Sequence, residues 1–124
     1  LCSSITSISF HHQTNNISKI MANADLAIGG GGTMTWERCC MGLPTIVVIL
    51  SENQHQLTEE VTKIGCVINL GQSNYLKPEN YAHIIKEIDV KTIQNMSKKC
   101  LRLVDGKGVK RVTNKIFQIM KSKI

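Results

Sequence analysis

The sequence predicts an α/β domain with a parallel sheet, and three observations support that prediction. Residues 45–50 form a run of apolar or β-branched residues without alternation, which is typical of a strand covered on both faces. Strand patterns alternate with helical patterns along the chain. Four consecutive glycines at residues 29–32 follow a strand pattern and precede a helical one. Together these features predict a Rossmann-like, three-layer α/β/α architecture.

The expected elements follow one another in a regular order. Asn15 or Asn16 can cap a short helix, Gly42 and Gly65 stop helical patterns, and Pro78 suits the first turn of another helix. Because the strand at 45–50 is apolar on both sides, helices should cover both of its faces. We expect strands at residues 3–10, 25–28, 45–50 and 66–70, and helices at residues 16–23, 33–41, 54–64, 78–87, 89–104 and 109–120.

Length and composition limit the classes of protein that this chain can represent. Its 124 residues suit a single domain over residues 1–124, and Leu1 in place of an initiator Met indicates a start inside a longer protein. The sequence has neither a membrane-length apolar run nor a signal-peptide pattern. We therefore expect a cytoplasmic protein without an integral membrane segment.

The net charge of +6 comes largely from the last third of the chain. A nucleic-acid partner would fit this charge, but aromatic residues for base stacking are few, and the lysines lie between apolar residues at helical spacing. We therefore expect no nucleic-acid partner. We expect the positive charge to raise the local concentration of a small phosphorylated ligand instead.

Cysteine and histidine spacings predict reduced thiols and no metal site. The five cysteines form an odd set without a C-x-x-C motif, and two of them are adjacent in a helical stretch, where they do not readily pair. The four histidines form no i, i+4 pair with a nearby acid. The cysteines are Cys2, Cys39, Cys40, Cys66 and Cys100, and the histidines are His11, His12, His55 and His83.

The glycine run predicts a loop that binds phosphate. Glycine lets backbone approach an anion closely, and a helix that begins at Thr33 or Thr35 offers unpaired N–H groups and the positive end of its dipole. The spacing fits neither the P-loop nor the dinucleotide fingerprint. A sharp turn from strand to helix is an equally good explanation of the glycines alone.

Three loops should share one site, because parallel sheets bind ligands at the carboxyl ends of their strands. These loops are residues 11–16, 29–35 and 51–54. Glu37 lies about one turn into the helix after the glycines, so its carboxylate can accept hydrogen bonds from a sugar diol beyond the phosphate. From the residues alone, the commoner explanation is that Glu37 complements the helix dipole, as acids in the first turn of many helices do. Asn53 and Gln54 offer amides suited to phosphate or hydroxyl groups, although Asn53 can also cap the next helix.

Residues 21–44, MANADLAIGGGGTMTWERCCMGLP, followed by Glu52, Asn53 and Gln54, resemble a known family over nearly the whole chain. The pattern is similar to the C-terminal half of the UDP-sugar hydrolases of pseudaminic-acid biosynthesis. These are the UDP-2,4-diacetamido-2,4,6-trideoxy-β-L-altropyranose hydrolases, which are related to spore coat polysaccharide biosynthesis proteins. It also resembles the UDP-binding half of MurG-type N-acetylglucosaminyltransferases. The resemblance implies one half of a GT-B fold.

The resemblance also implies the roles of individual residues, with UDP or a UDP-sugar as ligand and no cofactor. Gly31, Gly32, Thr33 and Thr35 would hold the diphosphate, and Glu37 would bind the ribose hydroxyls. Asn53 and Gln54 would contact phosphate or sugar, and the loop near Gln13 and Thr14 would read the uracil. The turn at residues 105–108 together with Arg111 also looks like the hydrolase pattern.

One motif of the hydrolase family is absent from this sequence. That family carries a Gly-x-Gly-His-x-x-Arg loop in its N-terminal domain, whose histidine is the proposed general base, and neither His11 nor His12 replaces it. The resemblance therefore implies a binding half without a catalytic residue. The N-terminal GT-B half would lie in the same chain or in a separate one. A MurG-like transferase domain and a non-catalytic subunit of a split enzyme remain alternatives.

Overall fold

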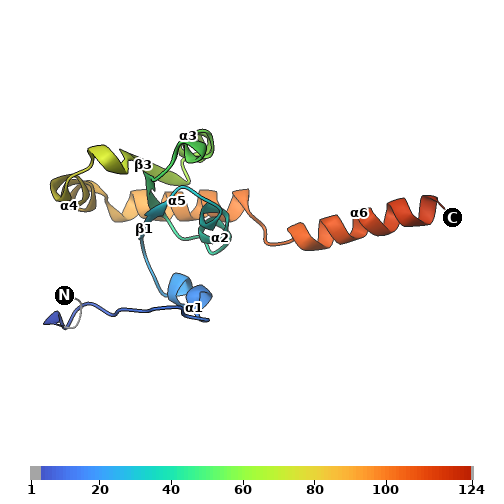
Figure 1. Ribbon diagram of the computed structural model, residues 1–124, viewed down its shortest axis with the longest axis horizontal. Helices are drawn as coiled ribbons and strands as arrows, with labels where there is room; N and C mark the ends of the chain where they lie inside the picture. The colour runs from blue at the N-terminus through green and yellow to red at the C-terminus, as the bar shows by residue number, and fades with distance from the viewer. Residues whose placement is uncertain (1–3, 124) are drawn as a thin grey trace.

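The computed structural model describes residues 4–123 of the chain (Figure 1). Its elements alternate between strand and helix through the middle of the sequence and end in three successive helices. The strands are β1 (Ala27–Gly30), β2 (Thr45–Ile49) and β3 (Val67–Gln72). The helices are α1 (Ile17–Ala22), α2 (Met34–Cys40), α3 (His55–Ile64), α4 (Pro78–Glu87), α5 (Val90–Leu103) and α6 (Gly108–Ser122), with short 3₁₀ turns η2 (Glu52–Gln54) and η3 (Ser73–Tyr75).

The three strands form one parallel sheet in the order β1-β2-β3. All five residues of β2 are buried, so the prediction of a central, doubly covered strand at this position is confirmed. Ile46 pairs in register with Ile28 on one side and with Ile68 on the other. An open parallel sheet with flanking helices confirms the predicted Rossmann-like α/β class.

The strand expected at residues 3–10 does not form. Residue 3 lies outside the described part of the chain, and residues 4–10 contain no strand. The apolar side chains that suggested alternation are exposed, with 73% of Phe10 accessible to solvent. Within residues 4–123, no strand pairs with this segment. An alternation of apolar and polar residues does not by itself make a strand. Without a neighbouring strand, the backbone N–H and C=O groups of the segment bond to water instead.

The boundaries of the first and last strands differ from those expected. β1 begins two residues later and includes Gly29 and Gly30, because these glycines pair with Val47 and Val48 of the buried central strand. β3 extends to Gln72 through a bulge, where the amide of Gly71 donates to the side chain of Asn69. The loop after β1 is therefore shorter than the glycine run suggests.

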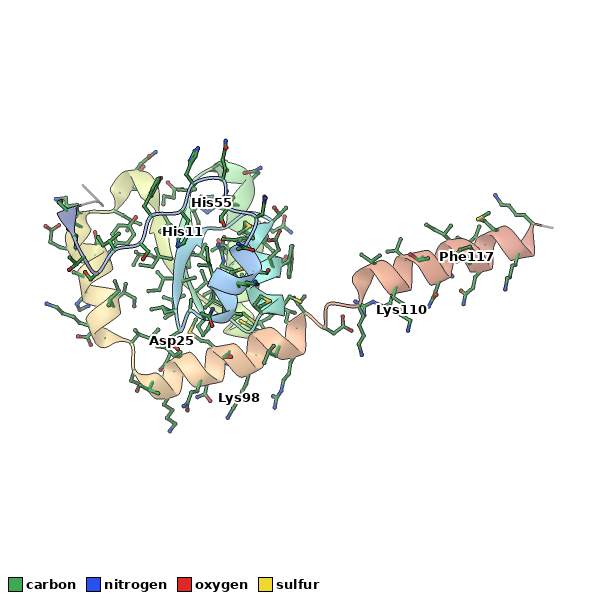
Figure 2. The ribbon with its side chains drawn as sticks, turned by 90° about the horizontal axis from the view of Figure 1, so that it is seen from below. His11, Asp25, His55, Lys98, Lys110 and Phe117 are labelled. Atoms are coloured by element: carbon green, nitrogen blue, oxygen red, sulfur yellow. The ribbon has the colours of Figure 1, made fainter. Side chains whose placement is uncertain are left out.

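Helices pack closely around this sheet. α3 packs against β2 and β3, and α2 packs against α5. In both overall views, α4 lies on the opposite side of the strands from α2 and α3 (Figures 1 and 2). Asp89 caps α5 by accepting a hydrogen bond from the amide of Thr92. The main apolar cluster consists of Cys39, Val47, Val61, Cys66, Val67 and Cys100.

The last helix, α6, projects away from the rest of the molecule (Figures 1 and 2). Every residue of α6 is exposed, including Phe117. Within residues 4–123, no helix has the length and apolar content needed to cross a lipid bilayer.

Candidate functional site

The carboxyl ends of β1 and β2 are joined by the side chain of Gln54. Its Oε1 atom accepts a hydrogen bond from the amide of Gly31, with an N···O distance of 3.2 Å, and another from the amide of Leu50 at 3.0 Å. One carbonyl oxygen therefore fixes the glycine loop against the loop after β2. Gln54 therefore lies in the predicted site, and its side-chain oxygen binds two backbone amides of the protein.

The other end of the Gln54 amide is available for a ligand. The structure gives Nε2 no hydrogen bond within the described chain, and this nitrogen lies 3.7 Å from the position that a Cβ atom would take on Gly32. It therefore faces the glycine loop as an unpaired donor.

The backbone of the glycine loop packs tightly against the sheet and α3. Gly31 is buried, and a Cβ atom there would overlap the hydroxyl of Thr58 and lie 3.2 Å from Val47. The Thr58 hydroxyl is itself buried without a hydrogen-bond partner. Only glycine fits this position without a shift of its neighbours.

Beyond Gly31, the loop presents free N–H groups. Within residues 4–123, the amides of Gly32, Thr33 and Met34 donate no hydrogen bond. The following amide, that of Thr35, donates to the carbonyl of Gly32 at 3.0 Å. Three successive donors at the start of α2 are the pattern expected of an anion-binding loop.

The buried side chain of Arg38 holds this loop in place through hydrogen bonds. Its Nη2 atom donates to the carbonyl of Gly30 at 2.7 Å and to the hydroxyl of Thr35 at 3.4 Å. The pKa of Arg38 is lowered, mainly because burial disfavours the charged guanidinium. A Cβ atom at Gly29 would lie 2.6 Å from Nη1, so this glycine makes room for the guanidinium. Sequence reasoning missed Arg38, although its spacing from Thr35 places both on one helix face.

The two predicted ligands on α2 occupy different environments. Thr35 is 1% exposed and its hydroxyl accepts from Arg38, so its side chain supports the loop from within. Glu37 is exposed, and its carboxylate makes no hydrogen bond or ion pair with any residue that the structure describes. Thr33 is also exposed and makes no side-chain capping bond.

The remaining predicted ligands lie in neighbouring or separate segments. Asn53 is exposed, and its Oδ1 atom accepts a hydrogen bond from the Ser51 hydroxyl at 2.6 Å. Gln13 has a positive φ of 48°, and the Thr14 hydroxyl accepts from the amide of Asn16. No hydrogen bond within residues 4–123 joins Gln13 or Thr14 to the glycine loop.

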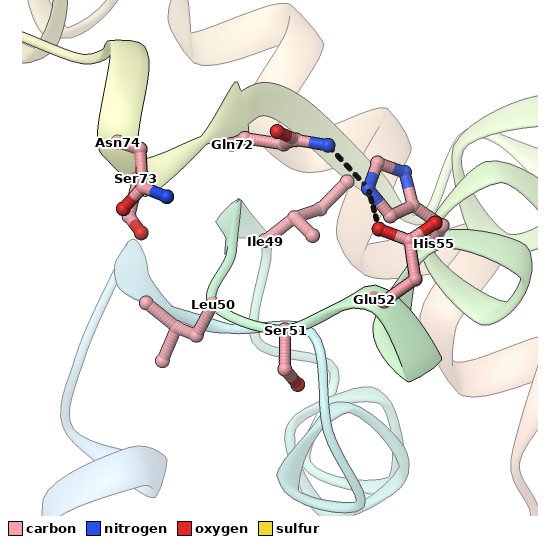
Figure 3. A pocket seen from close by; sticks show the side chains of 8 residues that line it. All are labelled: Ile49, Leu50, Ser51, Glu52, His55, Gln72, Ser73 and Asn74. Carbon is pink, nitrogen blue, oxygen red and sulfur yellow. Dashed lines mark hydrogen bonds and ion pairs between the residues drawn. The ribbon is translucent and has the colours of Figure 1, made fainter.

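A second set of polar residues lines a small cleft of about 110 Å³ between the ends of β2 and β3 (Figure 3). The Gln72 amide nitrogen lies 2.7 Å from Nε2 of His55, and a carboxylate oxygen of Glu52 lies 3.7 Å from the same nitrogen. A neutral imidazole therefore accepts from Gln72, whereas a protonated one pairs with Glu52. Sequence reasoning missed His55 and Gln72, although both follow from the rule that ligands bind at strand ends.

The comparison with protein families decides the class of this chain. The model of one protein family, described as "Glycosyltransferase family 28 C-terminal domain", matches residues 3–114 of this chain. The chain belongs to this family. Membership makes it a nucleotide-sugar-binding domain of the GT-B superfamily, in agreement with the open parallel sheet.

Individual relatives agree with this assignment. The chain is 32% identical over 103 residues to the spore coat polysaccharide biosynthesis protein SpsG of Bacillus subtilis (strain 168), covering 82% of this chain and 30% of that protein. It is similar to two UDP-N-acetylglucosamine–N-acetylmuramyl-(pentapeptide) pyrophosphoryl-undecaprenol N-acetylglucosamine transferases. For the Helicobacter acinonychis (strain Sheeba) protein the identity is 29%, covering 94% of this chain and 35% of the relative. For the Helicobacter pylori (strain ATCC 700392 / 26695) protein it is 33%, covering 76% and 27%. The chain thus spans about a third of the length of these relatives.

Proposed function

We propose that this domain binds the UDP part of a UDP-sugar, with the diphosphate against the start of α2. The observation that supports this proposal is the row of free amides at Gly32, Thr33 and Met34. They lie beside the unpaired Nε2 of Gln54, which adds a fourth donor to the same loop. Four neutral donors and the helix dipole suit a diphosphate better than a neutral ligand.

The ribose would lie toward Glu37. This carboxylate is exposed and unpaired within the described chain, one turn beyond the free amides. A carboxylate accepts two hydrogen bonds from a diol at once, which explains why acids often read a ribose. Asn53 would contact a phosphate or the sugar, and Gln13 and Thr14 would face the uracil after the segment before α1 moves to the loop.

The buried residues of the predicted site would act through the backbone. Gly31 donates its amide to Gln54, and Thr35 accepts from Arg38, so both hold the loop in shape. They would contribute to diphosphate binding indirectly, by fixing the position of the free amides that follow Gly31. The charge of Arg38 adds a positive potential beneath the loop.

The proposed reaction of the whole protein is hydrolysis of a UDP-sugar, which releases UDP and the free sugar. This domain would steady the departing diphosphate, and an N-terminal GT-B half, in the same chain or a separate one, would supply the base that activates water. The proposed role of the whole protein is in surface-polysaccharide or nonulosonic-acid biosynthesis, and similarity to a spore coat polysaccharide biosynthesis protein over 82% of the chain supports the first of these. Similarity to the two transferases supports a second candidate, in which an acceptor hydroxyl replaces water.

Calorimetric titration of the full chain with UDP tests the binding proposal. We expect Glu37→Gln to weaken UDP binding about tenfold or more, because it replaces charged hydrogen bonds to the ribose by neutral ones. Thr33→Val should weaken binding as well. The control is Glu59→Gln, which neutralises another exposed carboxylate on α3 and should leave the affinity unchanged. Equal affinities for UDP and uridine would refute the diphosphate site.

Product analysis separates the two candidate reactions. The complete GT-B protein would be incubated with UDP-sugar in the presence and absence of an acceptor. Release of free sugar without an acceptor supports the hydrolase. Sugar transfer that requires the acceptor supports the transferase.

A further inference from the structure

Three cysteines from distant parts of the sequence meet in the core. Cys39 lies on α2, Cys66 directly precedes β3 and Cys100 lies on α5. Their sulfur atoms all lie within 4.8 Å of one another, and each residue is at most 1% exposed. Sequence reasoning expected no metal site, because these residues form no spacing motif. The fold brings them together.

The three thiols differ in their pKa values. The pKa of Cys39 is lowered to about 7, first because of the interaction between its sulfur and the neighbouring Cys100 thiol. The pKa of Cys100 is raised by the same contact, and the pKa of Cys66 is raised by burial. The Cys100 sulfur also lies 3.3 Å from the carbonyl of Cys66.

We propose that Cys39, Cys66 and Cys100 together bind one thiolate-preferring divalent cation of the zinc type. Three sulfurs at about 2.3 Å from one ion lie roughly 3.7–4.0 Å apart, so the cluster needs only a small contraction. Soft thiolate ligands select such ions over calcium or magnesium. Within residues 4–123, no further His, Cys, Asp or Glu joins the cluster, so the protein supplies three ligands.

Charge balance favours a divalent ion. Three thiolates carry three negative charges, of which a divalent cation cancels two, and Arg38, the neighbour of Cys39 in sequence, is a buried positively charged residue. Among the ion pairs of the described chain, none engages Arg38. The single net negative charge of a metal-bound cluster would complement this buried cation.

Binding displaces the protons of the three thiols, which leave to solvent as three sulfur–metal bonds form. Affinity should therefore fall as the pH is lowered. The bound ion would tie α2 to α5 and to the start of β3, and α2 carries the glycine loop at its first turn. Metal binding should raise the melting temperature of the chain.

Titration of the reduced full chain with Cd²⁺ alone tests this site, followed through the ultraviolet charge-transfer absorption of cadmium thiolates. We expect one ion per chain, displacement by Zn²⁺, and at least a tenfold loss of affinity in Cys39→Ser. Cys40→Ser is the matched control, because Cys40 adjoins Cys39 on α2 but lies outside the cluster. It should bind Cd²⁺ as the unaltered chain does.

Two results would overturn the proposal. One is the absence of stoichiometric Cd²⁺ binding by the unaltered reduced chain, which holds whether or not any variant folds. The other is an equal loss of affinity in Cys40→Ser and in Cys39→Ser. Circular dichroism verifies the fold of each variant, and Cys66→Ser provides a second cluster variant that should also lose binding.

Discussion

Gln54 offers the sharpest test of how the candidate site is held together. Its Oε1 atom accepts two backbone hydrogen bonds, from Gly31 and from Leu50. Gln54→Met keeps the length of the side chain and removes both. The Gly31 amide is buried, and an unpaired buried donor costs about 1–3 kcal/mol, whereas the Leu50 amide belongs to an exposed residue and can be hydrated. We expect a loss of about 2 kcal/mol in the free energy of unfolding.

Urea denaturation measures this loss, and a matched glutamine provides the control. Gln56 lies on α3 near Gln54, and its amide donates only to the exposed side chain of Glu60. Gln56→Met should change the free energy of unfolding by less than about 0.5 kcal/mol. A comparably small change in Gln54→Met would refute the bridging role derived from the two distances.

A second substitution separates stability from ligand binding at the same position. In Gln54→Glu, the carboxylate still accepts from both amides, so the free energy of unfolding should fall less than in Gln54→Met. The variant loses the Nε2 donor and places a negative charge beside the proposed diphosphate. UDP affinity should therefore fall at least tenfold in calorimetric titration. Retained affinity would exclude Gln54 from the phosphate site.

Three further predictions concern the core, the loop and an exposed ion pair. Ile46→Ala should lower the free energy of unfolding by about 2–5 kcal/mol in urea denaturation, and its half-exposed partner Ile28→Ala by clearly less. Gly31→Ala should cost roughly 1–3 kcal/mol in the same assay and weaken UDP binding, because the added methyl overlaps a buried hydroxyl. Arg111 lowers the pKa of Asp105 to about 2, so the stabilisation by this pair is present above the ordinary carboxylate pKa and is lost as the pH falls toward 2. In Arg111→Gln, nuclear magnetic resonance titration should show a higher pKa for Asp105, which stays below its ordinary value because the amide of Lys107 still donates to the carboxylate.

Elements whose burial can be read from the residues of a single segment were predictable from the sequence. The run at residues 45–50 has no polar side, and the structure places this strand in the middle of the sheet. Residues 3–10 also carry a strand pattern, yet residues 4–10 pair with no strand of the described chain. Whether a strand forms depends on a second strand that pairs with it and can be far away in sequence. The pattern of residues within one segment does not show whether such a partner exists.

The candidate site divides in the same way. The glycine loop and Gln54 follow strand patterns directly, so sequence reasoning placed them at one edge of the sheet, and the structure joins them by hydrogen bonds. Their roles toward a ligand remain predictions. The link between His55 and Gln72 was missed because it joins two segments that meet only in the fold. Arg38 was missed because its hydrogen bond to Gly30 depends on how the glycine loop turns back onto α2.

The projecting position of α6 has a consequence for the dynamics of the chain. A helix of 15 residues whose side chains are all in water gains little from packing, and its own hydrogen bonds are marginal at this length. Its amide protons should therefore exchange with deuterated solvent far sooner than those of β2, where every residue is buried. Stability in this protein is graded along the chain, from a rigid centre at the sheet to a terminal helix that opens and recloses by itself.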